Sequence, residues 1–219
     1  MTKKRIQAVL FGPQGCGKGT QGQLLAERFD VPLIGAGEML RDEIRDATPI
    51  GKILHGYVDA GLMAPDDLVN AVIAERIKHL DLSRGFILDG FPRNVEQAIH
   101  LDKQMKINLA VYLKISDTEA VRRLTGRRQC VRCKTIFHVT DVPPAKSGIC
   151  SVCGGKLAPR DDDYEEAIRK RLATFHFMTE PLVTYYRQRG VLLTLNGEQP
   201  IPYVFEDLIN KMAKLGFSS

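Results

Sequence analysis

The sequence predicts an α/β fold in which helices cover both faces of a parallel sheet, giving three layers (α/β/α). Short apolar runs alternate with segments of helical periodicity along most of the 219 residues. Strands that alternate with helices form parallel sheets with right-handed crossovers. The first apolar run leads directly into a glycine-rich loop. The composition changes over 127–160, where four cysteines and a pair of prolines indicate a small inserted unit.

Five strands are expected from apolar runs that end in turn residues. They are 6–11, 31–34, 85–90, 108–115 and 191–195. The run at 108–115 is apolar at nearly every position, which is typical of a strand that is covered on both faces.

The expected helices follow helical periodicity and the usual start and stop residues. They are 18–29, 38–45, 48–60, 65–77, 94–105, 117–126, 163–177, 182–189 and 203–215. Pro49 suits the first position of a helix, and Gly61 is expected to end that helix. Asp117 is expected to cap its helix. Asp163 and Glu166 have the spacing of a capping box at the start of the next.

The glycine-rich loop, residues 12–20, reads Gly-Pro-Gln-Gly-Cys-Gly-Lys-Gly-Thr. Glycines allow a backbone to approach phosphate oxygens closely, and the helix that follows adds a partial positive charge at its N-terminus. Lys18 supplies a full charge. A strand, such a loop, a lysine and a helix together predict a nucleotide phosphate site. The hydroxyl that usually follows the lysine directly is displaced here, because Gly19 precedes Thr20.

The composition is that of a globular protein, with 44% hydrophobic and 26% charged residues. No apolar run approaches the ~18 residues that a membrane span needs, and the apolar run after the basic N-terminus is too short for a signal peptide. We therefore expect a cytoplasmic protein that does not enter a membrane. The net charge of +5 fits either nucleic acid or a cluster of arginines around polyphosphates, and composition alone leaves both open.

Four of the five cysteines form two Cys-x2-Cys pairs, Cys130 with Cys133 and Cys150 with Cys153, with sixteen residues between the pairs. In a cytosolic chain this spacing predicts a metal site rather than disulfides. Four thiolates fill the tetrahedron of a zinc ion and leave no position for water, so the zinc is expected to be structural. Cys16 lies in the glycine-rich loop. Nearby positive charge could lower its pKa, but we interpret it as a space-filling residue.

Polar side chains at the carboxyl ends of the strands are candidates for chemistry, since ligands bind there in open parallel sheets. Asp89 ends one strand and is placed to orient Mg²⁺ through water. Arginines able to bind polyphosphates lie at element ends or beside the insert: Arg41, Arg93, Arg123, Arg127, Arg160 and Arg171.

Taken together, these motifs resemble the adenylate kinases, in their long form with a zinc-bearing lid. The motifs that carry the resemblance are 12–20, 37–41, 89–93, 126–128, 160–163 and 169–171, and the likeness covers 5–216. The offset Gly19-Thr20 fits this family's own version of the loop.

The resemblance implies a P-loop core of three segments, 1–34, 65–126 and 165–219. It also implies a helical insert that binds a nucleoside monophosphate (NMP), 35–64, and a zinc-bearing lid, 127–164. The implied reaction is reversible phosphoryl transfer from Mg-ATP to AMP, giving two ADP. The implied partners are these nucleotides, and the implied state is a monomer.

The resemblance also assigns residues to the two nucleotides. Those implied to bind ATP are Gly15, Cys16, Gly17, Lys18, Gly19, Thr20, Arg123, Arg127, Ile136, Phe137 and Gln199. Those implied to bind AMP are Ala36, Arg41, Leu62, Met63, Ala64, Gly90, Arg93, Gln97, Arg160 and Arg171. Catalysis is implied for Lys18, Arg93, Arg127, Arg160 and Arg171, with Asp89 and Thr20 on the water shell of magnesium.

Two residues depart from the pattern. Ala36 stands where many adenylate kinases have threonine, and together with Asn94 it resembles the UMP/CMP kinases of the same superfamily. Gln97 and the long lid favour AMP.

A zinc-ribbon protein that binds nucleic acid is a second alternative. Phe137 is the only aromatic residue between Cys130 and Cys153, and this reading leaves the glycine-rich loop without a function. We therefore expect no nucleic-acid partner.

Overall fold

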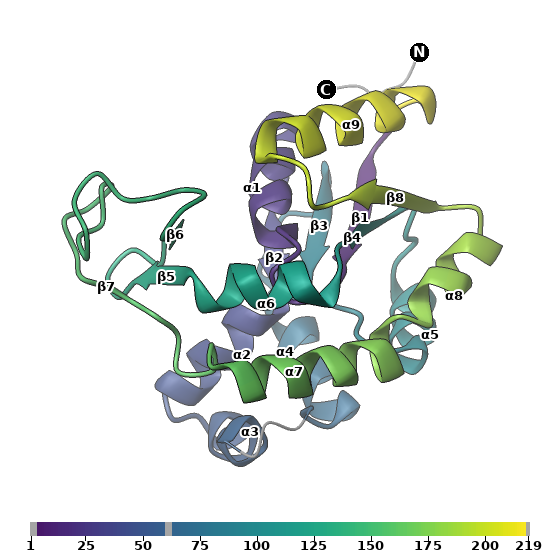
Figure 1. Ribbon diagram of the computed structural model, residues 1–219. Helices are drawn as coiled ribbons and strands as arrows, with labels where there is room; N and C mark the ends of the chain where they lie inside the picture. Colours follow the sequence, from purple (N-terminus) through teal and green to yellow (C-terminus); the bar gives the residue numbers. More distant parts are fainter. Residues whose placement is uncertain (1–3, 60–62, 218–219) are drawn as a thin grey trace.

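The protein is built around one parallel sheet, described here from a computed structural model that covers residues 4–59 and 63–217 (Figure 1). The sheet has five strands in the order β2-β3-β1-β4-β8. Their bounds are β1 (Ile6–Phe11), β2 (Leu33–Gly35), β3 (Gly85–Asp89), β4 (Leu109–Lys114) and β8 (Leu192–Asn196). All of the neighbouring pairs are parallel, so the carboxyl ends of the strands share one edge.

Helices occupy the connections between the strands. They are α1 (Lys18–Phe29), α2 (Ala36–Arg45), α3 (Pro49–Asp59), α4 (Asp66–Lys78), α5 (Val95–Gln104), α6 (Asp117–Thr125), α7 (Glu165–Thr174), α8 (Leu182–Gln188) and α9 (Ile201–Lys214). None of the helices within the described residues combines the length and apolar character that crossing a membrane requires.

Two apolar clusters lie on the two faces of the sheet. One joins the sheet to α1, α6, α7 and α9, and includes the fully buried Leu25, Leu124 and Leu208. The other joins it to α2, α3, α4, α5 and α8. The central strands β1 and β4 contribute to both clusters, which explains why their sequences are continuously apolar. The three-layer α/β/α fold predicted from the sequence is therefore confirmed.

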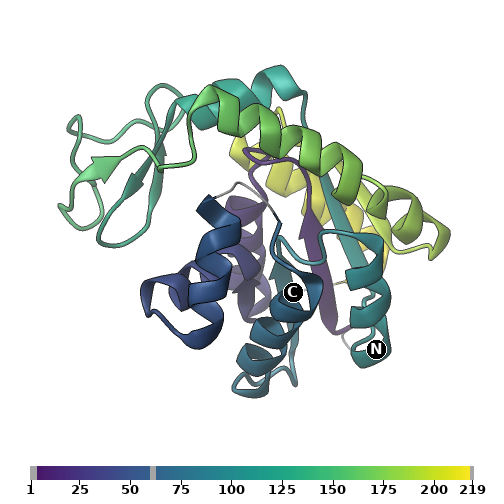
Figure 2. The same cartoon turned by 90° about the horizontal axis from the view of Figure 1, so that it is seen from below.

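The cysteine-rich insert forms a separate antiparallel sheet that projects to one side of the core (Figures 1 and 2). Its strands are β5 (Arg127–Cys130), β6 (Ile136–His138) and β7 (Leu157–Ala158), in the order β6-β5-β7. Its own small cluster contains Cys130, Phe137, Cys150 and Leu157. After the roles that the resemblance implies, we call residues 127–164 the lid and residues 35–64, which include α2 and α3, the NMP subdomain.

The structure corrects two predicted helix caps. Ser116, and not Asp117, caps α6, because its side chain accepts from the backbone N–H of Glu119. The predicted capping box at Asp163 is also absent. Tyr164 occupies the cap position of α7 without a side-chain bond, and Asp163 is paired with an arginine instead. A π-helical segment, Phe175–Thr179, follows α7 and was not predicted.

Candidate active site

The glycine-rich loop connects β1 to the N-terminus of α1. Gly15 and Gly17 have φ values of 83° and 89°, a backbone region that L-residues other than glycine adopt only with strain. Gly17 is the residue that precedes α1, and Lys18 is the first residue of the helix. The ammonium of Lys18 donates to the carbonyl of Pro13 at 3.3 Å, so it folds back over the loop. The helix N-terminus and the cation of Lys18 are therefore both at the glycine-rich loop, a combination that suits the binding of phosphate.

Asp89 ends β3 beside this loop. Its Oδ1 is buried and has no hydrogen-bond partner among the described residues. Burial raises the pKa of Asp89, and the charges of Lys18, Arg93 and Arg41 oppose that shift. A Cβ on Gly19 would lie 3.4 Å from Oδ2 of Asp89, so a glycine keeps this approach open. An unpaired carboxylate oxygen beside a phosphate loop is an acceptor that suits the water shell of a hydrated Mg²⁺.

Five of the six predicted arginines influence one another electrostatically, which places them in one cluster. Burial lowers the pKa of Arg93, and Arg171 and Arg41 lower it further. The pKa of Arg160 falls to about 10, first because of burial and then because of Arg127 and Arg41. These arginines come from the NMP subdomain, the core and the lid, so the fold brings together groups that are far apart in the sequence.

Carboxylates of the lid hold this cluster in place. Asp163 accepts from Nε and Nη2 of Arg127 at 2.7 and 2.6 Å, and its carboxylate is fully buried. Asp162 pairs with Arg171 at 2.9 Å, and its charge also acts on Arg41 of the NMP subdomain. The sequence did not predict that these acids pair with arginines. The run of three aspartates after Arg160 was interpreted as part of a family motif, and Asp163 as a helix cap.

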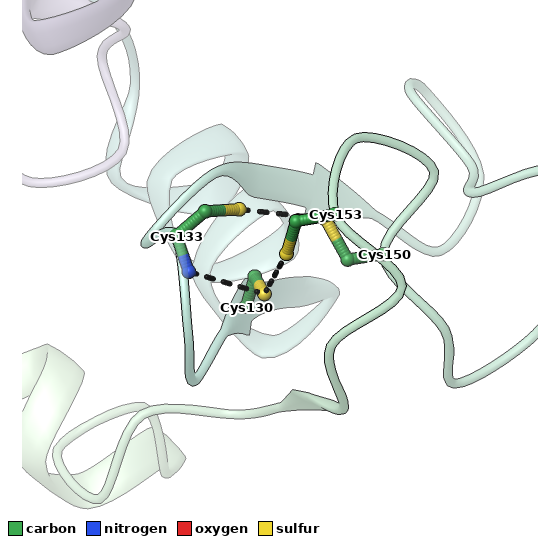
Figure 3. A group of neighbouring side chains, drawn as sticks. All are labelled: Cys130, Cys133, Cys150 and Cys153. Atoms are coloured by element: carbon green, nitrogen blue, oxygen red, sulfur yellow. Dashed lines mark hydrogen bonds between the residues drawn. The ribbon is translucent and has the colours of Figure 1, made fainter.

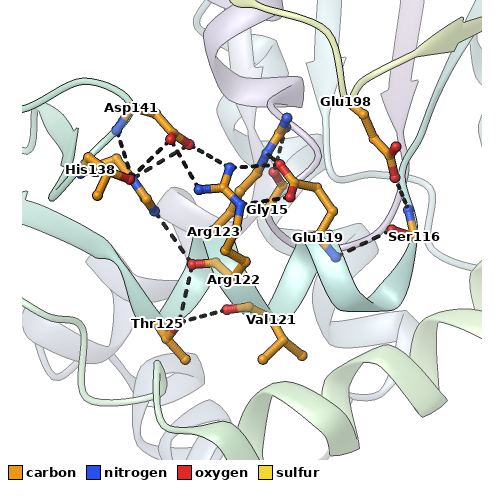
Figure 4. A network of polar contacts seen from close by, with 11 residues as sticks. Gly15, Ser116, Glu119, Val121, Arg122, Arg123, Thr125, His138, Asp141 and Glu198 are labelled. Atoms are coloured by element: carbon orange, nitrogen blue, oxygen red, sulfur yellow. Dashed lines mark hydrogen bonds and ion pairs between the residues drawn. The ribbon is translucent and has the colours of Figure 1, made fainter.

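The sixth arginine, Arg123, lies on α6 against the glycine-rich loop (Figure 4). Its Nη1 is 3.4 Å from the carbonyl of Gly15, and its Nε donates to Glu119 at 2.6 Å. Glu119 also accepts from Arg122, and Arg122 binds Asp141 of the lid with two hydrogen bonds. Glu119, which the sequence did not single out, therefore couples Arg123, which contacts the loop, to a core–lid ion pair.

On the NMP side, Ala36 begins α2 and is buried, and Gly90 accepts from Nε of Arg93 at 3.0 Å. Gln97 is 1% exposed, and its Oε1 accepts from the backbone N–H of Arg93 at 2.7 Å. Met63 and Ala64 are partly buried. Leu62, also predicted for this site, lies outside the described residues.

On the ATP side, the lid strand β6 presents Ile136, which is 47% exposed. Phe137 is 7% exposed and packs in the lid cluster with Cys130. Gln199 lies in the turn between β8 and α9, and another residue of that turn approaches the loop. A Cβ on Gly197 in that turn would lie 3.0 Å from the carbonyl of Cys16.

The four lid cysteines converge as their spacing predicts (Figure 3). All four Sγ atoms lie within 4.8 Å of one another, and the pairs Cys130–Cys153 and Cys133–Cys150 are 3.5 Å apart. Four free thiols at this separation fit a single tetrahedral zinc ion, for which thiolates are preferred ligands.

Cys16 is buried in the glycine-rich loop. Burial raises its pKa and outweighs Lys18, whose charge acts in the opposite direction. The suggestion that positive charge lowers the pKa of this thiol is therefore wrong, and its burial agrees with a space-filling role.

Comparison with known proteins gives a consistent result. A family model described as adenylate kinase matches residues 10–191. An adenylate kinase of Acidothermus cellulolyticus is 42% identical over 204 residues, covering 91% of this chain and 94% of that protein. One of Streptomyces coelicolor is 43% identical over 205 residues, with coverage of 91% and 94%. One of Methanothrix thermoacetophila is 40% identical over 214 residues, with coverage of 95% and 99%.

The fold, the glycine-rich loop, the convergent arginines and these similarities lead to one conclusion. The chain belongs to the adenylate kinase family and is an ATP:AMP phosphotransferase, an enzyme that reversibly converts Mg-ATP and AMP into two ADP.

Proposed function

We propose that the described residues divide this reaction between two nucleotide sites that meet at the arginine cluster. The ATP phosphates lie on the loop, held by Lys18 and by the amides of Gly15, Cys16, Gly17, Gly19 and Thr20. Arg123 and Arg127 bind them from the core and the lid. Ile136 and Phe137 pack on the ATP base, and Gln199 lies near it. The closeness of Lys18, Gly15 and Arg123 supports this placement.

AMP binds on the opposite side of the cluster. Arg41 and Arg93 hold its phosphate, and Gln97 hydrogen-bonds the base near Ala36, Gly90 and the 62–64 backbone. Both Ala36 and Gln97 are buried, so a base reaches them only when the NMP subdomain moves. Such a movement is typical of lids and clamps that enclose a substrate.

Catalysis rests on positioning and charge, because the phosphate acceptor is already an anion and no protein nucleophile is needed. Arg93, Arg127, Arg160 and Arg171 surround the space between the two phosphate sites and neutralise charge on the transferring group. The single observation that carries this proposal is the approach of arginines from three parts of the chain. Asp163 binds Arg127 of the lid and lies 3.6 Å from Arg171 of the core. A Cβ on Gly37 would lie 3.3 Å from Arg41 and 3.6 Å from Arg93. Lys18 is the remaining cation that we assign to catalysis.

Asp89 and Thr20 are placed to hold the water shell of Mg²⁺, and the buried, unpaired Oδ1 of Asp89 fits that role. Held there, Mg²⁺ would offset negative charge on the ATP phosphates. Zn²⁺ at the four lid cysteines is structural, because all of its ligand positions are protein sulfur. We further propose a cytoplasmic monomer, since free thiols are typical of a reducing compartment.

A lid that closes over ATP follows from its two arginines, Arg127 and Arg160, which lie near the two ends of the insert. Closure expels water that could otherwise accept the phosphoryl group. Two fluorophores, one on the lid at the exposed Val152 and one on the core, report the motion. Their separation should shrink when an analogue joining two adenosines through five phosphates is added, and an unchanged separation contradicts a moving lid.

The substrate is tested by ADP formation from ATP with AMP, CMP, UMP and GMP in parallel. AMP should be the preferred acceptor. The alternative, a UMP/CMP kinase, drew on Asn94. That residue caps α5 with Oδ1 and donates to Asp66 with Nδ2, so its occurrence has a structural explanation. Faster turnover of CMP than of AMP would establish the alternative.

A further inference from the structure

The first turn of α4 and the first turn of α5 are joined by a polar network around Asp66. Its carboxylate accepts from Nε2 of Gln97 at 2.7 Å. It also accepts from Nδ2 of Asn94, at 3.0 Å to one oxygen and 2.8 Å to the other. Gln97 and Asn94 are 1% and 4% exposed, so their amides are held in a buried setting where an unpaired polar atom is costly.

This network fixes which way the Gln97 amide faces. The backbone N–H of Arg93 can only donate, and it contacts Oε1 of Gln97 at 2.7 Å. The Asp66 carboxylate has only acceptors to offer, and it contacts Nε2. Rotating the amide by half a turn would set two donors against each other at Arg93 and two acceptors against each other at Asp66. Asn94 is fixed in the same way, because its Oδ1 accepts from the N–H of Gln97 at 2.7 Å.

A fixed amide distinguishes purines that a freely rotating amide would accept equally. After these two contacts, Gln97 retains one N–H and one lone pair on oxygen. Adenine offers a complementary pair, the acceptor N1 and the donor N6. Hypoxanthine has the reverse pattern, a donor at N1 and an acceptor at O6. A glutamine free to flip pairs with either base, so its orientation determines the selection.

We propose that Asp66 is a positioning residue that makes this enzyme select AMP over IMP, by holding the Gln97 amide in the orientation that pairs with adenine. The inference rests on the proposed contact between Gln97 and the AMP base. Asp66 itself touches no substrate and acts through Gln97.

The test compares kcat/KM for AMP and for IMP in the wild type, Asp66→Asn and Asp66→Ala. The wild type should prefer AMP by roughly 10²-fold or more, as expected of a site built around specific base hydrogen bonds. Each variant should narrow that preference by about tenfold, because alanine removes the acceptor for Gln97, and asparagine, which can present either a donor or an acceptor, no longer fixes the orientation of the amide. KM for ATP should change less than twofold. Asn keeps the size of the side chain, so it remains informative if the alanine variant folds poorly.

Asp67 provides a matched control. It also lies in the first turn of α4 and is exposed, so Asp67→Asn removes the same charge from the same helix end without touching Gln97. Its AMP preference should equal that of the wild type. Equal loss of AMP and IMP turnover in Asp66→Asn, with an unchanged ratio, overturns the proposal.

Gln97→Ala separates this inference from the proposed base contact. An unchanged ratio in Gln97→Ala refutes the contact itself, and with it the role of Asp66. A changed ratio in Gln97→Ala together with an unchanged ratio in both Asp66 variants refutes the role of Asp66 alone.

Discussion

Asp163 joins the two ends of the lid by binding Arg127 through two hydrogen bonds of 2.7 and 2.6 Å. Arg127 begins the first lid strand, and Asp163 lies just before the helix that returns to the core. The carboxylate is fully buried and also lies 3.6 Å from Arg171 of the core. One buried acid thus sets the position of two arginines that we assign to catalysis.

Asp163→Ala should lower both stability and turnover. Removing one partner of a buried ion pair leaves the other charge uncompensated, which costs about 3 kcal/mol. Thermal unfolding and kcat measured on the same preparation check the expectation. Asp161→Ala is the control, because Asp161 is a neighbouring but exposed acid. Equal melting temperatures for the two variants contradict a structural role for Asp163.

Lys18→Ala should remove most of the activity and leave the fold intact. Within the described residues, the hydrogen bonds of the ammonium go to loop carbonyls and to the Cys16 sulfur, so its removal should open no apolar cavity. Loss of one preorganised charge at the transferring group typically lowers kcat by a factor of ~10²–10³. Steady-state kinetics beside Lys103→Ala, an exposed lysine on α5, measure the difference. A Lys18 variant that retains more than about a third of the wild-type kcat removes Lys18 from the role we give it.

Metal removal should loosen the lid before the core melts. The cluster within the lid is small and includes two of the metal ligands, whereas the two clusters of the core contain none of the four. Cys150→Ser should lose the metal, lower the melting temperature and expose the lid to protease while residues of the core sheet stay protected.

The readouts are metal analysis, differential scanning calorimetry and limited proteolysis. Val152→Ala is the control, because Val152 lies between two of the ligands but is exposed. One ion per chain is expected in the wild type. Wild-type protein prepared without chelator that contains no metal, with unchanged melting of Cys150→Ser, would argue against the site.

His176 should contribute more stability in mild acid than in alkali. It contacts Glu180 at 2.8 Å and Asp117 at 2.9 Å, and these two acids raise its pKa. The contribution is therefore complete below the unfolded pKa of ~6.5 and is lost as the pH rises through the raised folded value.

Urea unfolding of the wild type and His176→Gln checks this sign. The difference in free energy of unfolding between the two proteins should be larger at pH 6 than at pH 9. It should be at most about 1 kcal/mol, because the groups are partly exposed. His100→Gln is the control, since His100 contacts Gln104 rather than a carboxylate. A difference that grows toward pH 9 contradicts the assignment.

The features predicted correctly from the sequence are those that local spacing determines. The glycine-rich loop and the pairs of cysteines each lie within a few consecutive residues, so their residue types and intervals define their geometry. The order of apolar runs likewise determined the layers of the fold. Helix ends were predicted within one or two residues in most cases.

The features that the sequence did not reveal depend on tertiary contacts. Asp163 has the spacing of a helix cap, but Arg127 competes for it from 36 positions away. Nothing near Asp66 indicates that it binds Gln97, because the contact spans two helices. The same applies to Glu119, whose partners include an arginine that reaches the lid. Long-range ion pairs leave no periodic signal in one sequence.

The small interior of the lid has a consequence for how fast its metal can be exchanged. Cys130 and Cys150 are at once its most buried side chains and half of its ligand set, while Cys133 is exposed. A chelator can reach the outer sulfur directly, but we expect it to remove a bound zinc ion only after the cluster of Phe137 and Leu157 with the inner pair has opened. The rate of metal transfer to a chelator should therefore report how fast the lid opens, and it can be measured while the rest of the enzyme remains folded.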